Sequence, residues 1–147
     1  MWVLHNPEVG YIVFNYEGNR SKRGAMSTLK QYQSGYLQTD GYQRYNEIAA
    51  RPGISRLGCL AHVRRKFFDA QQNDLKRSNY VLKVIQEIYA YEEKSRELTA
   101  DERKAYRQEH LLLVYQALKT WLQEQSHQIT PKSAIREAFN YALSEQR

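Results

Sequence analysis

Hydrophobic positions follow a strand pattern in the first part of the chain and a helix pattern in the second. Residues 1–4 and 11–16 form apolar, β-branched or aromatic runs, and the Asn-Pro and Gly signals between them predict a β-hairpin. Two more short apolar runs, at 36–37 and 54–60, predict further strands. Short strands that alternate with helical patterns favour an α/β layer with at least one parallel pair of strands.

Helices are predicted between these strands. Short helices are expected over residues 25–33 and 42–51, and Pro52-Gly53 ends the second of them. A longer helix is expected to follow the last strand, from Ala61 to about residue 72. The first half therefore contains a hairpin and a strand–helix–strand–helix run.

After residue 73 the sequence carries helix-forming residues and no strand signal. Thr99, followed three residues later by Glu102, has the pattern of a capping box at a helix start. Three helices are expected: residues 80–98, Thr99 to about Gln125, and a last helix that starts at Thr130-Pro131. Residues 78–126 are thus predicted to form a helical hairpin.

Composition limits the class of protein. The 147 residues are 41% apolar and 26% charged, with no apolar run near the roughly 18 residues of a membrane span. The N-terminus lacks a basic start followed by a long apolar stretch, so no signal peptide is expected. The single cysteine, Cys59, excludes an internal disulfide and fits a reducing cytoplasm.

The net charge of +6 is concentrated in the first half. Residues 1–72 carry ten Lys/Arg against five Asp/Glu, whereas residues 73–147 carry twelve against eleven. A basic field attracts polyanions such as nucleic acid, although a basic surface kept for solubility explains the charge alone equally well. The candidate phosphate contacts are cations in a loop and at a helix opening: Arg20, Lys22 and Arg23, then Arg64, Arg65 and Lys66 after His62.

Two groups carry candidate chemistry. Asp40 directly follows the run at 36–37, so its carboxylate is expected to emerge where a strand ends. Cys59 and His62 have a spacing found in zinc sites, but a structural site needs four ligands and the other histidines form no second paired motif. We therefore expect no zinc site, and no Ser/His/Asp order or glycine-rich phosphate loop supports a hydrolase or a nucleotide-binding protein.

Several stretches together resemble one protein family. They are Tyr36-Leu37-Gln38-Thr39-Asp40-Gly41-Tyr42 with Tyr45-Asn46, Gly58-Cys59-Leu60-Ala61-His62-Val63-Arg64-Arg65-Lys66-Phe67-Phe68, residues 133–143, Trp2-Val3 and residues 11–16. The chain resembles the central part of the catalytic domain of the insertion sequence 66 family of bacterial DDE transposases. The resemblance covers nearly the whole chain.

The resemblance implies an α/β fold. Residues 1–72 would be a partial ribonuclease-H-like core, residues 73–129 a helical insertion, and residues 130–147 a C-terminal helix that leads towards the last acidic region. In the family, three carboxylates hold two Mg²⁺ ions for phosphoryl transfer. Asp40 matches the second of these, as a catalytic residue and metal ligand, whereas the first Asp and the last Glu are expected to lie outside this chain.

The resemblance also implies partners. Transposon-end DNA would be bound by Arg20, Lys22, Arg23, His62, Arg64, Arg65 and Lys66, in the bacterial cytoplasm and not at a membrane. Full-length transposase and the products of flanking reading frames are further expected partners. We expect a truncated chain that is inactive alone.

Two alternatives stay open from the sequence. One is a DNA-binding remnant without catalysis, and the other is a helical module whose apolar stripes around Ile85 and Leu118 bind a protein partner. Salt-sensitive DNA binding would distinguish the first from the second.

Overall fold

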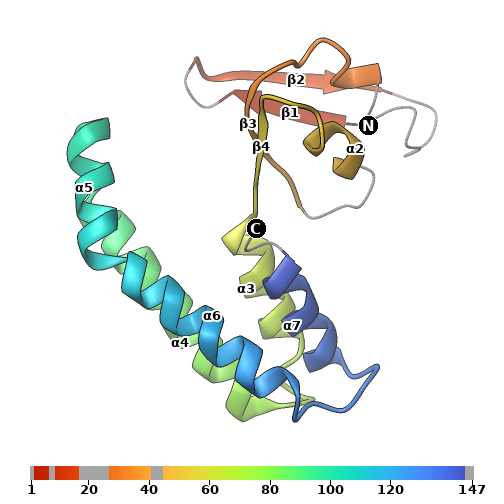
Figure 1. The fold of residues 1–147 in the computed structure, drawn as a ribbon, viewed down its shortest axis with the longest axis vertical. Helices are drawn as coiled ribbons and strands as arrows, with labels where there is room; N and C mark the ends of the chain where they lie inside the picture. The colour runs from red at the N-terminus through yellow and green to blue at the C-terminus, as the bar shows by residue number, and fades with distance from the viewer. Residues whose placement is uncertain (1, 7–8, 17–26, 41–44, 145–147) are drawn as a thin grey trace. The chain divides into compact units, whose positions relative to one another are not determined.

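The chain divides into two compact units, Met1–Gly58 and Cys59–Arg147, and each is described by itself. A computed structural model describes residues 2–6, 9–16, 27–40 and 45–144. The first unit contains the strands and the second contains the long helices (Figure 1). The mixed α/β class predicted from the sequence is confirmed.

The predicted hairpin is present at the start of the first unit. Strand β1 (Trp2–Asn6) pairs antiparallel with β2 (Tyr11–Asn15), and Gly10 takes a positive φ of 70° in the turn, a conformation that glycine adopts without strain. All the described side chains of β2 except that of Asn15 are exposed, including Tyr11 (73%) and Phe14 (65%). An apolar run exposed on both faces is unusual for a strand, since such runs are typical of strands covered on both sides.

The predicted parallel pair is also present. Strand β3 (Gly35–Gln38) pairs with β4 (Ile54–Leu57) from Gly35 opposite Ile54 to Gln38 opposite Leu57. Between them lies the short helix α2 (Asn46–Ala49). Among the described residues of this unit, Leu29, Ile48 and Ile54 form the buried core, and Leu4, Tyr32, Leu37 and Tyr45 pack against it.

The strands do not form one sheet in the described residues. The hairpin and the parallel pair are separate two-stranded sheets, so a continuous ribonuclease-H-like sheet is not seen here. In the described part of the helix predicted over 25–33, the backbone is helical at 27–28 and forms a turn over 29–31. Residues 25–26 and 42–44 of the two short predicted helices lie outside the described residues.

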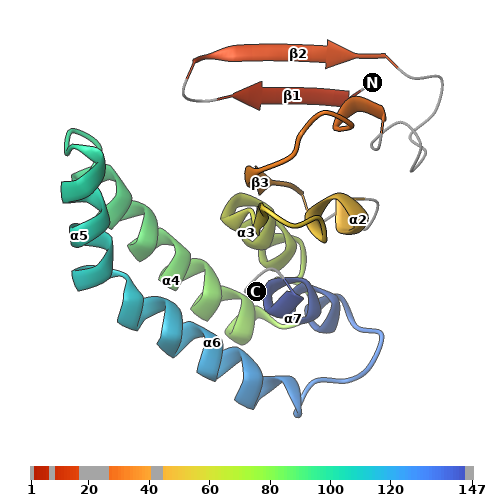
Figure 2. The same ribbon diagram turned by 45° about the horizontal axis from the view of Figure 1, so that its top comes forward.

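The second unit is helical. It contains α3 (Leu60–Asp69), α4 (Leu75–Lys94), α5 (Ala100–His110), α6 (Leu112–Ser126) and α7 (Ala134–Ser144). In both views α4 runs beside α5 and α6, and α3 packs against α4 and α7 (Figures 1 and 2). Its core centres on Phe67 and Phe139, whose rings lie 5.4 Å apart, with Trp121 5.7 Å from Phe139. Helix α3, which sequence analysis grouped with the strands, thus belongs by packing to this unit.

Several helix boundaries differ from the prediction. Helix α4 begins at Leu75 and not at Tyr80, because the Asp74 carboxylate caps it by accepting from the Arg77 amide at 3.0 Å. The helix expected from Thr99 to Gln125 is divided at the buried Leu111 into α5 and α6. The Thr99–Glu102 capping box predicted at its start is present.

Helix α7 begins later than Pro131. The Ser133 hydroxyl accepts from the Arg136 amide at 3.2 Å, which is the contact of an N-cap three residues before its partner. Asn73 adds a second cap from elsewhere in the chain, since its Oδ1 accepts from the Ile135 amide at 3.1 Å. Lys132, with a φ of 62°, lies between Pro131 and the helix, so proline does not occupy the first helical position.

Among the described residues, no helix is both long enough and apolar enough to cross a membrane.

Candidate nucleic-acid interface

Helix α3 buries two of its apolar residues and leaves its cations exposed. Val63 and Phe67 are buried one turn apart, whereas His62, Arg64, Arg65 and Lys66 are all exposed. Successive helical side chains point about 100° apart, so residues two positions apart point in nearly opposite directions. Arg64 and Lys66 therefore lie on opposite flanks of the helix. Arg65 lies between them on the side that is most exposed to solvent, which we call the crest.

Arg64 lies on the flank that faces α4. Burial raises the pKa of the Tyr89 hydroxyl of α4, the neighbouring Cys59 thiol adds to that rise, and the Arg64 guanidinium opposes it. The Arg64 charge is thus close enough to act on the Tyr89 hydroxyl, in agreement with the packing of α3 against α4. Cys59 itself precedes α3 as its cap residue, but its thiol makes no capping hydrogen bond.

Arg65 lies on the crest, where 81% of its side chain is exposed. Its Nε is 4.0 Å from Asp69, one turn later on the same helix. An exposed pair at this distance contributes little free energy, so the guanidinium can leave Asp69 for another anion.

Lys66 lies on the opposite flank and faces α7. Its ammonium nitrogen is 5.9 Å from the centroid of the Tyr141 ring, within the range of a cation–π contact. A neutral ring attracts the ammonium without neutralising it. The charge of Lys66 thus remains available to a phosphate.

Asp40 belongs to the first unit. It follows β3 by two residues and is exposed, and the preceding Thr39 amide donates to the Leu57 carbonyl at 3.4 Å. Parallel strands end at the same edge, so Asp40 lies at the carboxyl edge of the β3–β4 pair, where ligands of α/β sheets commonly bind.

The donor set around Asp40 does not form a complete magnesium site. Among the described residues, no group of three or more His, Cys, Asp or Glu side chains could hold a metal ion. Mg²⁺ requires near-octahedral oxygen coordination and loses its waters reluctantly, so one carboxylate leaves it largely hydrated.

The predicted site residues are thus divided. His62, Arg64, Arg65 and Lys66 lie together on α3 in the second unit, and Asp40 lies in the first. Arg20, Lys22 and Arg23 lie outside the described residues. Sequence reasoning missed Tyr141, because its contact with Lys66 joins positions far apart in the chain and leaves no local pattern.

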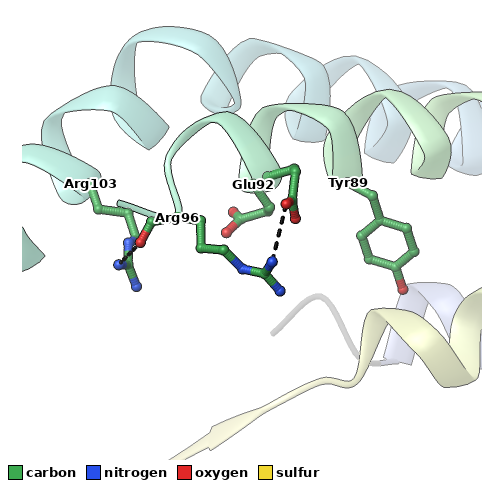
Figure 3. Close-up of a pocket in the computed structure, with 5 residues that line it drawn as sticks. Tyr89, Glu92, Arg96 and Arg103 are labelled. Carbon is green, nitrogen blue, oxygen red and sulfur yellow. Dashed lines mark hydrogen bonds and ion pairs between the residues drawn. The ribbon is translucent and has the colours of Figure 1, made fainter. Parts of the chain in front are cut away.

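A hollow of about 360 Å³ lies along α4 towards its C-terminal end, and the charged side chains around it already have ion-pair or hydrogen-bond partners. Arg96 pairs with Glu93 at 3.1 Å, and Arg107 donates two hydrogen bonds to Glu92. Arg103 donates to the carbonyls of Ser95, Arg96 and Leu98 and so caps the end of α4 (Figure 3). The hollow is therefore lined by groups that join α4 to α5: Tyr89, Glu92, Glu93, Arg96 and Arg103.

Comparison with known proteins identifies one family and several relatives. The family model described as "Transposase IS66 family" matches residues 1–147. The chain is 34% identical over 145 residues to the uncharacterized protein y4jD of Sinorhizobium fredii, covering 94% of this chain and 28% of that protein. It is 31% identical over 119 residues to y4qI of the same organism, covering 76% of this chain and 22% of that protein.

No solved structure matches the chain. The chain spans about a quarter of the length of the curated relatives it matches. The family model covers every residue, including the Asp40 stretch and the basic opening of α3, and on this ground the chain belongs to the IS66 family of transposases.

Proposed function

We propose that this chain is a DNA-binding part of a DDE transposase that takes part in DNA transposition. The observation that carries the proposal is the exposed cationic face of α3 in a chain whose whole length matches a transposase family. Phosphate contacts from Lys and Arg supply most of the sequence-independent affinity for DNA. The bound DNA in the cell would be transposon ends, in the bacterial cytoplasm.

The catalytic part of the proposal concerns Asp40. In a complete transposase it would be one carboxylate ligand of a Mg²⁺ pair in a ribonuclease-H-like core, where the two ions bridge the reacting oxygens. Because the described residues contain no group of three or more His, Cys, Asp or Glu side chains that could hold a metal ion, this chain would not perform phosphoryl transfer by itself.

Other chains are proposed to supply what is lacking. The relatives carry about three quarters of their length outside the matched part. The apolar side chains of β2 are exposed, as expected for a strand that another segment covers. Full-length transposase and the products of flanking reading frames are the candidate partners.

The alternative of a helical protein-interaction module loses its basis in the structure. Ile85 is 0% exposed and Leu118 is 3% exposed, so the stripes proposed for partner binding form the core of the helical unit. A DNA-binding remnant without catalysis remains compatible with the exposed cations of α3.

Titration of fluorescent duplex DNA at several salt concentrations tests DNA binding. We expect weak binding that falls steeply and linearly on a log–log plot between about 50 and 200 mM salt. Replacing Arg64, Arg65 and Lys66 together by Gln should lower the affinity about tenfold and reduce the salt slope by about two, because roughly one unit of slope is lost per phosphate contact.

A matched control removes the same charge elsewhere. Lys76, Lys83 and Lys119 are exposed on α4 and α6, and their triple Gln variant should bind DNA nearly as the unmodified chain does. Equal losses in the two triple variants would show a net-charge effect and no interface on α3. Binding that does not depend on salt would contradict the proposal as a whole.

A further inference from the structure

The position of Lys66 indicates where the phosphates of a bound DNA strand would cross the helical unit. We call this line of phosphates the phosphate track. Its ammonium lies over the Tyr141 ring of α7, so the Lys66 side chain extends from α3 towards α7. Helices α3 and α7 are held together just beneath this contact by the buried pair of Phe67 and Phe139. A phosphate that meets Lys66 therefore lies above α7 as well as α3.

The opposite flank is less suited to a polyanion. Arg64 lies beside Tyr89, and Tyr89 lines the same hollow as Glu92 and Glu93. Both carboxylates are paired, Glu92 with Arg107 and Glu93 with Arg96. DNA on this flank would meet the acidic oxygens of Glu92 and Glu93. The arginines there are already engaged, Arg96 and Arg107 by these carboxylates and Arg103 by backbone carbonyls.

Within the described residues, α7 carries no charged side chain after Glu137. Tyr141 is half-buried beside Lys66, and the exposed Ser144 lies one turn further on. Glu137, one turn before Tyr141, places an acidic boundary at the other end of this surface. Arg65, exposed on the crest of α3, adds a second cation beside Lys66.

We propose that DNA bound by Arg65 and Lys66 runs over the C-terminal half of α7, and that Tyr141 is a positioning residue that holds Lys66 towards this track. The inference rests on the proposed DNA binding. It adds α7 to the interface and excludes the α4 flank beside Tyr89.

Two serines offer a matched charge probe. Ser144 ends α7 and Ser126 ends α6, and each hydroxyl donates to the carbonyl three residues earlier, at 2.8 Å and 2.7 Å. Replacing either serine by Glu removes the same hydrogen bond and places the same charge at a helix C-terminus, where the helix dipole disfavours it equally. A difference in DNA affinity between Ser144→Glu and Ser126→Glu therefore reports proximity to the bound DNA.

The test compares DNA affinity by fluorescence anisotropy at low salt, with folding of each variant checked by circular dichroism. We expect Ser144→Glu to weaken binding about fivefold or more, and Ser126→Glu by less than about twofold, because repulsion between exposed charges is screened beyond roughly 10 Å. Ala90→Glu places the same charge on the exposed surface next to Tyr89 and should also change binding by less than about twofold.

Substitution of Tyr141 tests the positioning role separately. Tyr141→Phe keeps the ring and should bind nearly as the unmodified chain does, whereas Tyr141→Leu should reproduce most of the loss caused by Lys66→Gln. Equal losses in Tyr141→Phe and Tyr141→Leu would show that the ring does not act through Lys66.

The outcomes separate this inference from the proposed function. If the unmodified chain shows no salt-dependent binding, the proposed DNA binding fails. If it binds and Lys66→Gln weakens binding, but Ser144→Glu matches Ser126→Glu, the α7 track is wrong and the DNA-binding function stands. A larger loss in Ala90→Glu than in Ser144→Glu would assign the track to the α4 flank.

Discussion

Single polar side chains at helix ends set the boundaries of the helical unit. Asp74 caps α4 and Ser133 caps α7, and each accepts a hydrogen bond from an amide of the first turn. Arg77 also pairs with Asp74 at 2.7 Å and donates to Gln125 at 3.1 Å, which joins the start of α4 to the end of α6. Asp74 therefore contributes both to a helix start and to the packing of two helices.

Replacing Asp74 by Ala is expected to lower the free energy of unfolding of the helical unit by about 1 kcal/mol, the usual cost of losing an N-cap. Asp69→Ala is the control, because Asp69 is exposed at the end of α3 and its pair with Arg65 is weak. Denaturant unfolding followed by circular dichroism measures both variants. Equal stability of the two would contradict the capping role of Asp74.

The same residue predicts a pH dependence. Burial alone would raise the pKa of Asp74, but hydrogen bonds from Arg77 and the charges of Arg77 and Lys76 lower it below its usual value of 3.8. Because the folded pKa is depressed, the carboxylate stabilises the fold above pH 3.8, and this contribution is lost as the pH falls through the folded pKa. The stability difference between the unmodified chain and Asp74→Asn should therefore shrink at the acid end of this range. A stability difference that stays constant as the pH falls below 3.8 would contradict this prediction.

At the scale of elements, the packing of α3 predicts that its three cations contribute unequally to DNA binding. Arg65→Gln and Lys66→Gln should each lower DNA affinity and reduce the salt slope by about one, whereas Arg64→Gln should be nearly silent. The reason is geometric, because helical residues two positions apart point in nearly opposite directions and Lys66 points towards α7. Anisotropy titrations of the single variants measure the effect. Equal losses at all three positions would argue for an irregular basic loop in place of the helix.

Elements with local signals were predicted well from the sequence. The hairpin follows from two β-branched runs around a turn, and the parallel pair from strands separated by a helix. The Thr99–Glu102 box follows from a four-residue spacing pattern and is present with both of its hydrogen bonds. Each of these features depends on residues close together in the chain.

Features that depend on distant residues were not predicted. The start of α7 depends partly on Asn73, whose side chain accepts from Ile135. The Lys66–Tyr141 contact exists only because α3 and α7 pack together. For the candidate site, the exposure of the α3 cations was predictable from helical spacing, whereas their division between an α4 flank and an α7 flank required the packing.

At the scale of the whole molecule, the two units differ in the size of their cores. Among the described residues, the helical unit buries twelve in one cluster, whereas the cluster of the first unit contains three. Buried apolar area is the main stabilising contribution to folding, so the helical unit should be much the more stable of the two. Native-state amide exchange should show strong protection in α3, α4, α6 and α7 and weak protection in β1 to β4.

Core substitutions test this division. Phe139→Ala should lower the free energy of unfolding of the helical unit by about 3–5 kcal/mol. Ile48→Ala, a fully buried position of the first unit, should leave the exchange of α4 and α6 unchanged. Loss of protection in α4 and α6 on Ile48→Ala would show that the two units unfold as one.

The catalytic capacity of the chain also depends on the whole molecule. Asp40 is placed at the carboxyl edge of two parallel strands, but no group of three metal-binding side chains exists among the described residues. Two bridged ions are needed to stabilise the attacking and leaving oxygens in phosphoryl transfer, and one carboxylate does not assemble them. We therefore expect no product above background in nicking and strand-transfer assays on transposon-end DNA with Mg²⁺ or Mn²⁺.

Asp40→Asn is the control for this prediction, because it keeps the shape of the side chain and removes its charge. Activity in the unmodified chain that disappears in Asp40→Asn would contradict the prediction and would mean that a further carboxylate or a partner chain completes the site. Mixing the chain with full-length transposase or with flanking-frame products extends the test. Activity that appears only in the mixture, and only with Asp40 intact, would identify the chain as a catalytic subunit, because Asp40 would then be ligating metal in a site completed in trans.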